Sequence, residues 1–336
     1  MNVTRRDFIK LGSAGALGAA SLVSIAGGAP TGAGIQPPHP PASHAAGHGD
    51  NLMTGDVDPN GLNHFDPTAM LTDYDYGRVS LLPDGRTLRE YDFFAVEKEI
   101  EIAPGIFFPA WTYNGRVPGP TIRCTEGDLI RVRFVNGTGH PHSIHFHGFH
   151  TAGMDGLEPV PVGGEFTYEF GAEPFGLHLY HCHTLPLKRH IHKGLYGGFI
   201  VDPKEGRPPA RELFMLMNAF DTNFDSANEV YAVNTVGFHF QRHPIPIKVG
   251  ELIRMYVINI VEFDLINSFH LHANFFDVYR TGTRLQTDEF TDTIMLAQGE
   301  RAILETRFRW PGQYMFHAHV SEFAELGWLG MFEVTP

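Results

Sequence analysis

Cysteine is scarce in this chain, since only Cys124 and Cys182 occur among its 336 residues. The two thiols lie in unlike sequence contexts, so we expect no disulfide framework. Basic residues are also few, because 25 lysines and arginines stand against 38 aspartates and glutamates, for a formal net charge of -13 at pH 7. This balance argues against a nucleic-acid partner. Apolar runs of membrane-spanning length are missing as well, and we therefore expect no stable membrane insertion.

The first part of the chain has a character of its own. An arginine pair at 5–6 is followed by a mild apolar run at 11–25. This pattern resembles a twin-arginine export signal, and it predicts a signal peptide over residues 1–28 and a periplasmic or extracellular location. Residues 29–84 are rich in Gly, Pro, Ala, His and Asp, which predicts a low-complexity, loosely docked arm.

Alternating hydrophobicity dominates the remainder of the chain. The segment Phe-Ala-Val-Glu-Lys-Glu-Ile-Glu-Ile at 94–102 reads as a strand, because apolar and charged residues alternate along it. Turn-forming pairs such as Pro104-Gly105 and Asn136-Gly137 separate these segments. No long segment has helical periodicity. The sequence therefore predicts an all-β fold.

Segments of the first half of the chain recur in the second half. The matching pairs are 126–136 with 249–259, 145–147 with 270–272, and 176–183 with 312–319. An internal repeat of this length indicates a duplicated domain. We predict two copies of one β-sandwich, at residues 85–203 and 212–336, joined by the Pro/Gly-rich segment 202–210.

Histidine is abundant, with 20 residues, and many of them occur in His-x-His pairs. Residues i and i+2 of a strand share a face, so each pair can direct two imidazoles at one metal site. Imidazole is a ligand that suits copper and zinc. The four pairs within the repeated segments are His145/His147, His181/His183, His270/His272 and His317/His319. Two further pairs, His140/His142 and His190/His192, occur only in the first copy.

Cys182 lies directly between His181 and His183. On a strand, the thiol would face one way and both imidazoles the other. A thiolate with imidazoles suits a soft metal on the first face, and the histidine pair suits a second site on the opposite face. The second copy has Ala318 in place of the cysteine.

The thiolate needs two histidines to complete a mononuclear site. A His₂Cys trigonal arrangement with a weak axial position is the blue-copper geometry. We predict that Cys182 is joined by His142 and by either His190 or His192. The second copy has Asn267 in place of His142, so only the first copy is expected to hold such a site.

Together these motifs resemble those of two-domain, laccase-like multicopper oxidases that carry the blue copper in the first domain. The resemblance covers residues 85–336 and implies two tandem cupredoxin-like Greek-key β-sandwich domains. It favours His190 as the ligand, because the axial residue of a cupredoxin follows this histidine by five positions. Leu195 would then be the axial residue.

The resemblance also implies four copper ions per subunit and a full set of ligands. A reducing substrate, either a phenol or aromatic amine or a metal ion, would supply electrons that cross through Cys182 to His181 and His183. O₂ would be reduced to water by four electrons at a trinuclear cluster. The implied type 2 ligands are His145 and His270. The implied type 3 ligands are His147, His181, His183, His272, His317 and His319.

The distribution of the pairs predicts an assembly. Each expected domain supplies two of the four repeated pairs, so a complete cluster must lie where a first domain meets a second domain. A closed ring of three chains provides such a junction at every subunit boundary. The resemblance likewise implies a homotrimer.

Reduction of O₂ consumes protons, and proton delivery requires acidic groups near the cluster. Asp155 resembles the acidic residue that follows the His-x-His-Gly motif of multicopper oxidases. Glu322 and Glu325, which follow His319, are further candidates.

Two other functions share many of these ligands. A copper-containing nitrite reductase has two similar domains but needs only three histidines at its type 2 site, and it does not need His183. A non-enzymatic copper-binding electron-transfer protein does not require a three-copper arrangement. Cys124 is expected to be a small buried hydrophobic residue under each of these functions.

Overall fold

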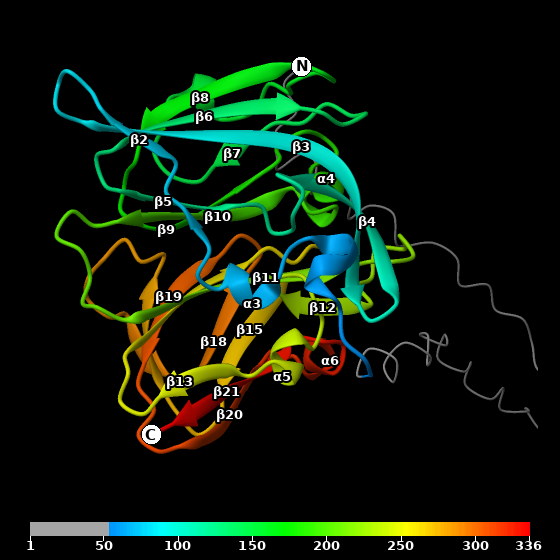
Figure 1. Cartoon of the computed structure of the whole chain (residues 1–336), viewed down its shortest axis with the longest axis vertical. Coiled ribbons are helices and arrows are strands. Elements are labelled where there is room, and N and C mark those ends of the chain that lie inside the picture. Colours follow the sequence, from blue (N-terminus) through cyan, green and yellow to red (C-terminus); the bar gives the residue numbers. More distant parts are fainter. Residues whose placement is uncertain (1–53) are drawn as a thin grey trace, which may run out of the picture. The chain divides into compact units, whose positions relative to one another are not determined.

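The computed structural model describes residues 54–336 (Figure 1). The expected signal peptide and the first part of the expected arm lie outside these residues. Strands dominate the described part, and its helices are short: η1 (Pro59–Asn63), α3 (Pro67–Met70), η2 (Ala152–Met154), α4 (Leu187–His192), α5 (His239–Arg242) and α6 (Ser321–Glu325). None of the helices in this part is long and apolar enough to cross a membrane.

The first half of the described chain forms two five-stranded sheets. One has the order β1-β5-β10-β9-β7, with β1 (Tyr74–Asp75), β5 (Thr121–Thr125), β7 (His145–Phe146), β9 (Gly176–His181) and β10 (Tyr196–Asp202). The other has the order β2-β3-β6-β8, and its fifth strand, β4, pairs with β3. These strands are β2 (Arg78–Leu81), β3 (Thr87–Ala103), β4 (Ile106–Tyr113), β6 (Leu129–Asn136) and β8 (Glu165–Gly171).

The second half forms a six-stranded and a five-stranded sheet. The larger one has the order β12-β11-β14-β19-β16-β17: β11 (Arg211–Phe220), β12 (Val230–Val233), β14 (Ile253–Asn259), β16 (Phe276–Arg280), β17 (Glu289–Thr291) and β19 (Arg301–Thr306). The smaller one has the order β13-β21-β20-β15-β18: β13 (Ile245–Lys248), β15 (Ile266–Leu271), β18 (Thr293–Ala297), β20 (Gly312–His317) and β21 (Leu329–Thr335). The prediction of an all-β chain with two sandwiches is confirmed.

The repeated strands β6 and β14 show how the two halves pack together. In β6, Ile130, Val132 and Phe134 are buried in the first core, and the residues between them are less buried. Every residue of β14 is buried. Its alternate residues enter the second core on one face, and on the other they enter a cluster that also contains Leu177 of β9. A strand that is covered on both faces is apolar throughout, and the two halves therefore share a continuous hydrophobic core.

Strand register positions the histidine pairs. β7 pairs with β9 so that His145 lies opposite His181. β15 pairs with β20 so that His270 lies opposite His317. Because directly opposed residues of an antiparallel pair have neighbouring side chains, each half of the chain brings its two His-x-His pairs together.

The expectation of a loose arm up to residue 84 is wrong for residues 54–84. Tyr74 of β1 pairs with Thr121, and β2 pairs with β3. Phe65 and Met70 are buried in the core shared by the two halves. The polar composition of the segment concealed these few apolar residues and strand pairs, which are sufficient to order it against the sandwiches.

Candidate metal centres

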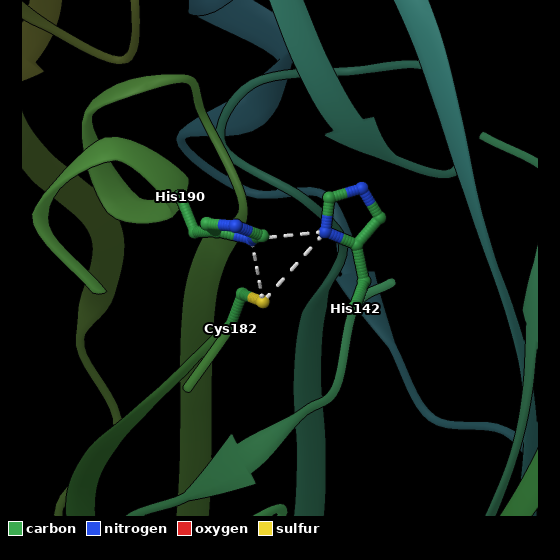
Figure 2. Close-up of side chains that lie close together, drawn as sticks. All are labelled: His142, Cys182 and His190. Carbon is green, nitrogen blue, oxygen red and sulfur yellow. Dashed lines mark hydrogen bonds between the residues drawn. The ribbon is translucent and has the colours of Figure 1, made fainter. Parts of the chain in front are cut away.

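Three side chains from separate segments meet beside the end of β9. His142 lies before β7, Cys182 directly follows β9, and His190 is in α4. The sulfur of Cys182 lies 3.3 Å from Nδ1 of His190 and 3.9 Å from Nδ1 of His142. The two Nδ1 atoms are 3.0 Å apart. Figure 2 shows these three side chains pointing toward one another, and we call them the mononuclear triad.

The mononuclear triad has the chemistry of a metal site. Burial lowers the pKa of His142 to about 3 and that of His190 to about 4, so both rings are neutral and offer lone pairs. Ligand atoms bound about 2.0–2.3 Å from one ion and spread around it lie about 3–4 Å apart, as these three do. Burial raises the pKa of the Cys182 thiol, and the backbone N–H of Ser143, which donates to its sulfur at 3.4 Å, opposes that shift. The residues present therefore fit a copper ion of the blue type.

The equivalent place in the second half has neither the thiol nor the first histidine of the triad, since Asn267 takes the position of His142. Ala318 takes the position of Cys182, and its N–H donates to the carbonyl of Trp328. Cys182 makes the same bond to the carbonyl of Leu195, so Trp328 is the equivalent of Leu195. The Trp328 ring is fully buried against Phe269. The second half therefore has a buried indole at the position that Leu195 takes in the first half.

On the other face of β9, the first half assembles four imidazoles: His145, His147, His181 and His183 (the first histidine group). The ring centroid of His145 lies 5.2 Å from that of His181 and 5.4 Å from that of His183. Nε2 of His147 lies 3.3 Å from Nε2 of His181. Burial lowers the pKa of His147 to about 2 and that of His181 to about 4, so both rings are neutral and able to bind metal.

The second half reproduces this arrangement with His270, His272, His317 and His319 (the second histidine group). The ring centroid of His270 lies 5.3 Å from that of His317 and 5.1 Å from that of His319. Nε2 of His272 lies 2.9 Å from Nε2 of His317. Two imidazole nitrogens bound at about 2.0 Å to one ion would lie about 2.8–4 Å apart, so both close pairs fit a shared metal.

Backbone carbonyls orient the rings in the same way in both groups. In two of the four pairs of equivalent histidines, His145/His270 and His181/His317, an Nδ1–H donates to a carbonyl and leaves Nε2 free for a metal. The four contacts are His145 to Asp155 at 2.9 Å, His270 to Asp292 at 2.9 Å, His181 to Cys182 at 2.9 Å, and His317 to Ala318 at 2.6 Å.

Two serines that the sequence analysis did not single out support the same sites. The N–H of His183 donates to the hydroxyl of Ser143 at 3.3 Å, and the N–H of His319 donates to the hydroxyl of Ser268 at 2.8 Å. Each serine precedes the first histidine of a pair by two positions. Aligning the two copies would therefore have found them.

The two histidine groups are open to the surface. His147 and His183 are partly exposed, and His272 and His319 are exposed. Among residues 54–336, no ring contact or hydrogen bond joins a member of the first group to a member of the second. Within the described residues, the two groups therefore lie at the surface as separate sets of four imidazoles.

The three candidate acids differ in their surroundings. Asp155 lies against the first histidine group, with Oδ1 3.2 Å from Nδ1 of His145 and 3.7 Å from Nε2 of His150. Glu322 and Glu325 are exposed on α6, and within the described chain no hydrogen bond or ion pair joins either to a histidine. Only Asp155 is brought to a histidine group by the fold of one chain.

Other predicted residues fall into distinct environments. His192 points away from the triad, since its Nε2 accepts the N–H of Asp221 at 2.9 Å. Leu195 is fully buried in the same cluster as Cys182. Cys124 is buried as a free thiol, as expected of a small hydrophobic residue.

Two family models match this architecture. Both are described as multicopper oxidase, and they match residues 96–206 and residues 207–336. The chain belongs to the multicopper oxidase family. The resemblance seen in the sequence is thereby confirmed, and the family implies copper as the metal.

Solved structures and curated relatives include both oxidases and nitrite reductases. The chain is 57% identical to a multicopper oxidase of known crystal structure, with a TM-score of 0.82 over 83% of this chain and 100% of that one. It is 26% identical to the copper nitrite reductase of Nitrosomonas europaea, with a TM-score of 0.70 over 74% of this chain and 94% of that one. It is 34% identical to the copper-containing nitrite reductase of Neisseria gonorrhoeae over 67% of this chain, and the match spans 62% of that protein's length.

Proposed function

We propose that this multicopper oxidase is laccase-like and couples one-electron oxidation of a reducing substrate to reduction of O₂. Four electrons and four protons convert one O₂ to two water molecules. Four copper ions per chain would be held, one by the mononuclear triad with Leu195 in the axial position and three by the two histidine groups. Copper, when bound, supplies the one-electron redox chemistry that the side chains lack.

The observation that carries the proposal is the match between the two histidine groups. The second group retains all four imidazoles, the Nε2 pair of His272 and His317 at 2.9 Å, and the carbonyl contacts of the first group. A nitrite reductase site with three histidines has no use for this complete second set. Eight imidazoles in two equivalent groups instead suit a cluster of three copper ions, for which each histidine group would be a half-site.

The chain itself links the two kinds of site. Cys182 of the mononuclear triad is joined by one peptide bond to His181 and by another to His183. The Nδ1–H of His181 also donates to the Cys182 carbonyl at 2.9 Å, so a hydrogen bond parallels the covalent route. Electrons that enter at the triad thus have a short path to the first histidine group.

The carboxyl of Asp155 is our proposed proton carrier. Its Oδ1 lies 3.2 Å from Nδ1 of His145, and its backbone carbonyl holds the same nitrogen at 2.9 Å. This residue can orient the ring through its carbonyl and exchange protons with solvent through its carboxyl. Glu322 and Glu325 remain further candidates, because they follow His319 at the second half-site.

A homotrimer completes the proposal, with three clusters at the subunit boundaries. Each half-site is partly open to solvent in one chain, and a ring of three chains would place a first half-site against a second at every junction. Histidines from two chains on shared copper ions would make metal loading and assembly support each other. We also propose export by the twin-arginine route to the periplasm or beyond, with a phenol, an aromatic amine or a metal ion as electron donor.

Copper content and oxygen uptake test the proposal together. The copper-loaded full chain should contain four copper ions and consume O₂ in the presence of a phenolic donor. The curated relatives make nitrite reduction the second candidate function. Two copper ions per chain, with nitrite consumed and no oxygen uptake, would support that candidate and refute the oxidase.

A further inference from the structure

A cavity of about 560 Å³ opens on the side of α4 to which His192 points. It lies between α4, which carries His190, and the segment around 221–226. The lining includes Lys188, Arg189 and Lys193 from α4 and its C-terminal end. A chain with a formal net charge of -13 thus places three cations around one cavity, at the helix that also carries His190.

Lys193 is the unusual member of this lining, because it is only 7% exposed. Within residues 54–336, no carboxylate lies within the 4.0 Å of an ion pair from its ammonium group. Its Nζ instead lies over the rings of Phe108 at 5.0 Å, Phe224 at 5.3 Å and Trp111 at 5.8 Å. A buried cation without an anionic partner is costly, and an anion entering the cavity would remove that cost.

The acids near the cavity do not provide this anion. Burial lowers the pKa of Lys193 to about 8, and the opposing charge of Glu97 acts from beyond the distance of an ion pair. The carboxylate of Asp221 accepts the backbone N–H groups of Asp225 at 3.1 Å and of Ser226 at 2.8 Å, so its oxygens are engaged within their own loop. Glu262 interacts with Lys188, but burial raises the pKa of this carboxyl to about 7. The cavity keeps a positive character near neutral pH.

The walls are aromatic as well as basic. Phe224 and Phe263 both line the cavity, and Lys188 Nζ lies 4.4 Å from the centre of the Phe263 ring. The Phe263 ring also contacts the ring of His192 at 4.9 Å. Aromatic walls beside cationic groups suit a planar ring that carries a negative substituent.

We propose that this cavity selects aromatic electron donors that carry a carboxylate, with the carboxylate paired to Lys193. The inference rests on the proposed oxidase function and names the substrate class of its electron-entry site. The Trp111 ring lies 5.8 Å from Nζ of Lys193 and 4.9 Å from the ring of His190, so one indole links the cation of the cavity to the triad. Each donor loses one electron and one proton from its phenol to become a phenoxyl radical, its carboxylate is unchanged, and O₂ is the final oxidant.

Matched donors test this proposal. Oxygen uptake by the copper-loaded full chain is compared for para-hydroxycinnamate and for its uncharged methyl ester. Lys193→Met should raise KM for the acid about tenfold, the equivalent of 1.4 kcal/mol, and leave KM for the ester unchanged. Lys193→Arg should restore use of the acid. Lys248→Met, which removes an exposed cation of β13, controls for net charge and should change neither KM.

A binding measurement separates this proposal from the oxidase function. Para-methoxycinnamate lacks the phenol and cannot be oxidised in the same way. Its affinity can therefore be measured by calorimetry whether or not the protein has oxidase activity. Weaker binding to Lys193→Met than to the parent supports the proposal even if no donor drives oxygen uptake. Equal affinity of both proteins for para-methoxycinnamate would overturn the proposal. So would an equal change in KM for the acid and the ester in Lys193→Met while the blue absorption persists.

Discussion

Nδ1 of His142 lies 3.0 Å from Nδ1 of His190, and both rings are buried and neutral. Two neutral imidazoles that direct nitrogens at one point, with the sulfur of Cys182 3.3 Å from the second, leave a position for a cation between them. This relationship joins segments that are 48 residues apart in the chain. The predictions for Cys182 and Leu195 follow from this arrangement.

We expect Cys182→Ser to abolish the intense blue absorption of the copper-loaded protein, because the hydroxyl does not replace a thiolate ligand. The histidine groups should still bind copper, as measured by metal analysis. Cys124→Ser is the matched control, since this other buried thiol lies outside the triad, and its absorption should equal that of the parent. Persistent blue colour in Cys182→Ser would show that the thiolate lies elsewhere.

Leu195→Met should lower the reduction potential of the blue site. A thioether in the axial position would add a weak donor that stabilises the oxidised ion, which the leucine cannot provide. A redox titration followed by the blue absorption measures the shift. Leu195→Ile keeps an apolar side chain of the same volume and should leave the potential near that of the parent; an equal shift in both variants would argue against an axial role.

His183→Ala should uncouple the two sites. The triad remains intact, so a donor should still bleach the blue absorption, but reoxidation by O₂ should be lost because the first histidine group lacks one imidazole. Stopped-flow absorption measures both steps. His243→Ala, which removes an exposed histidine of the ion pair with Asp56, serves as the control and should keep both steps. Normal reoxidation in His183→Ala would contradict the proposed cluster.

Asp155→Asn should slow oxygen reduction about 10–100-fold, the usual effect of changing a group that supports a metal-bound histidine. The backbone carbonyl still holds His145, so copper content should stay near that of the parent. Oxygen uptake and metal analysis distinguish these outcomes. Glu322→Gln and Glu325→Gln, tested separately, show whether either exposed acid contributes; unchanged turnover in Asp155→Asn would move the proton route away from this residue.

The trimer is tested by complementation. His145→Ala and His270→Ala should each be inactive, because each defect lies in a different half-site. When the two proteins are dissociated and reassembled together, some junctions should combine an intact first half-site with an intact second half-site, and oxygen uptake should partly return. No recovery, or a monomeric mass for the active copper-loaded protein, would rule out clusters shared between chains.

Local pattern alone was enough to predict which histidines would lie close together within each half of the chain. Two histidines at positions i and i+2 share a face because of the two-residue period of a strand. In all four repeated pairs the two rings do lie on one side and contact each other. The loss of the triad from the second copy could be predicted from Asn267 and Ala318. These inferences needed no knowledge of distant contacts, because backbone geometry over a few residues determines which side chains share a face.

Tertiary structure decided the rest. His190 and His192 are two positions apart on α4, and only the packing of that helix directs one ring at Cys182 and the other at Asp221. The order of residues 54–84 and the cavity around Lys193 likewise depend on segments far apart in the chain. Sequence by itself determined which residues have the chemistry of a copper site, whereas the fold determined which of them meet, because proximity across long loops arises from packing and not from local spacing.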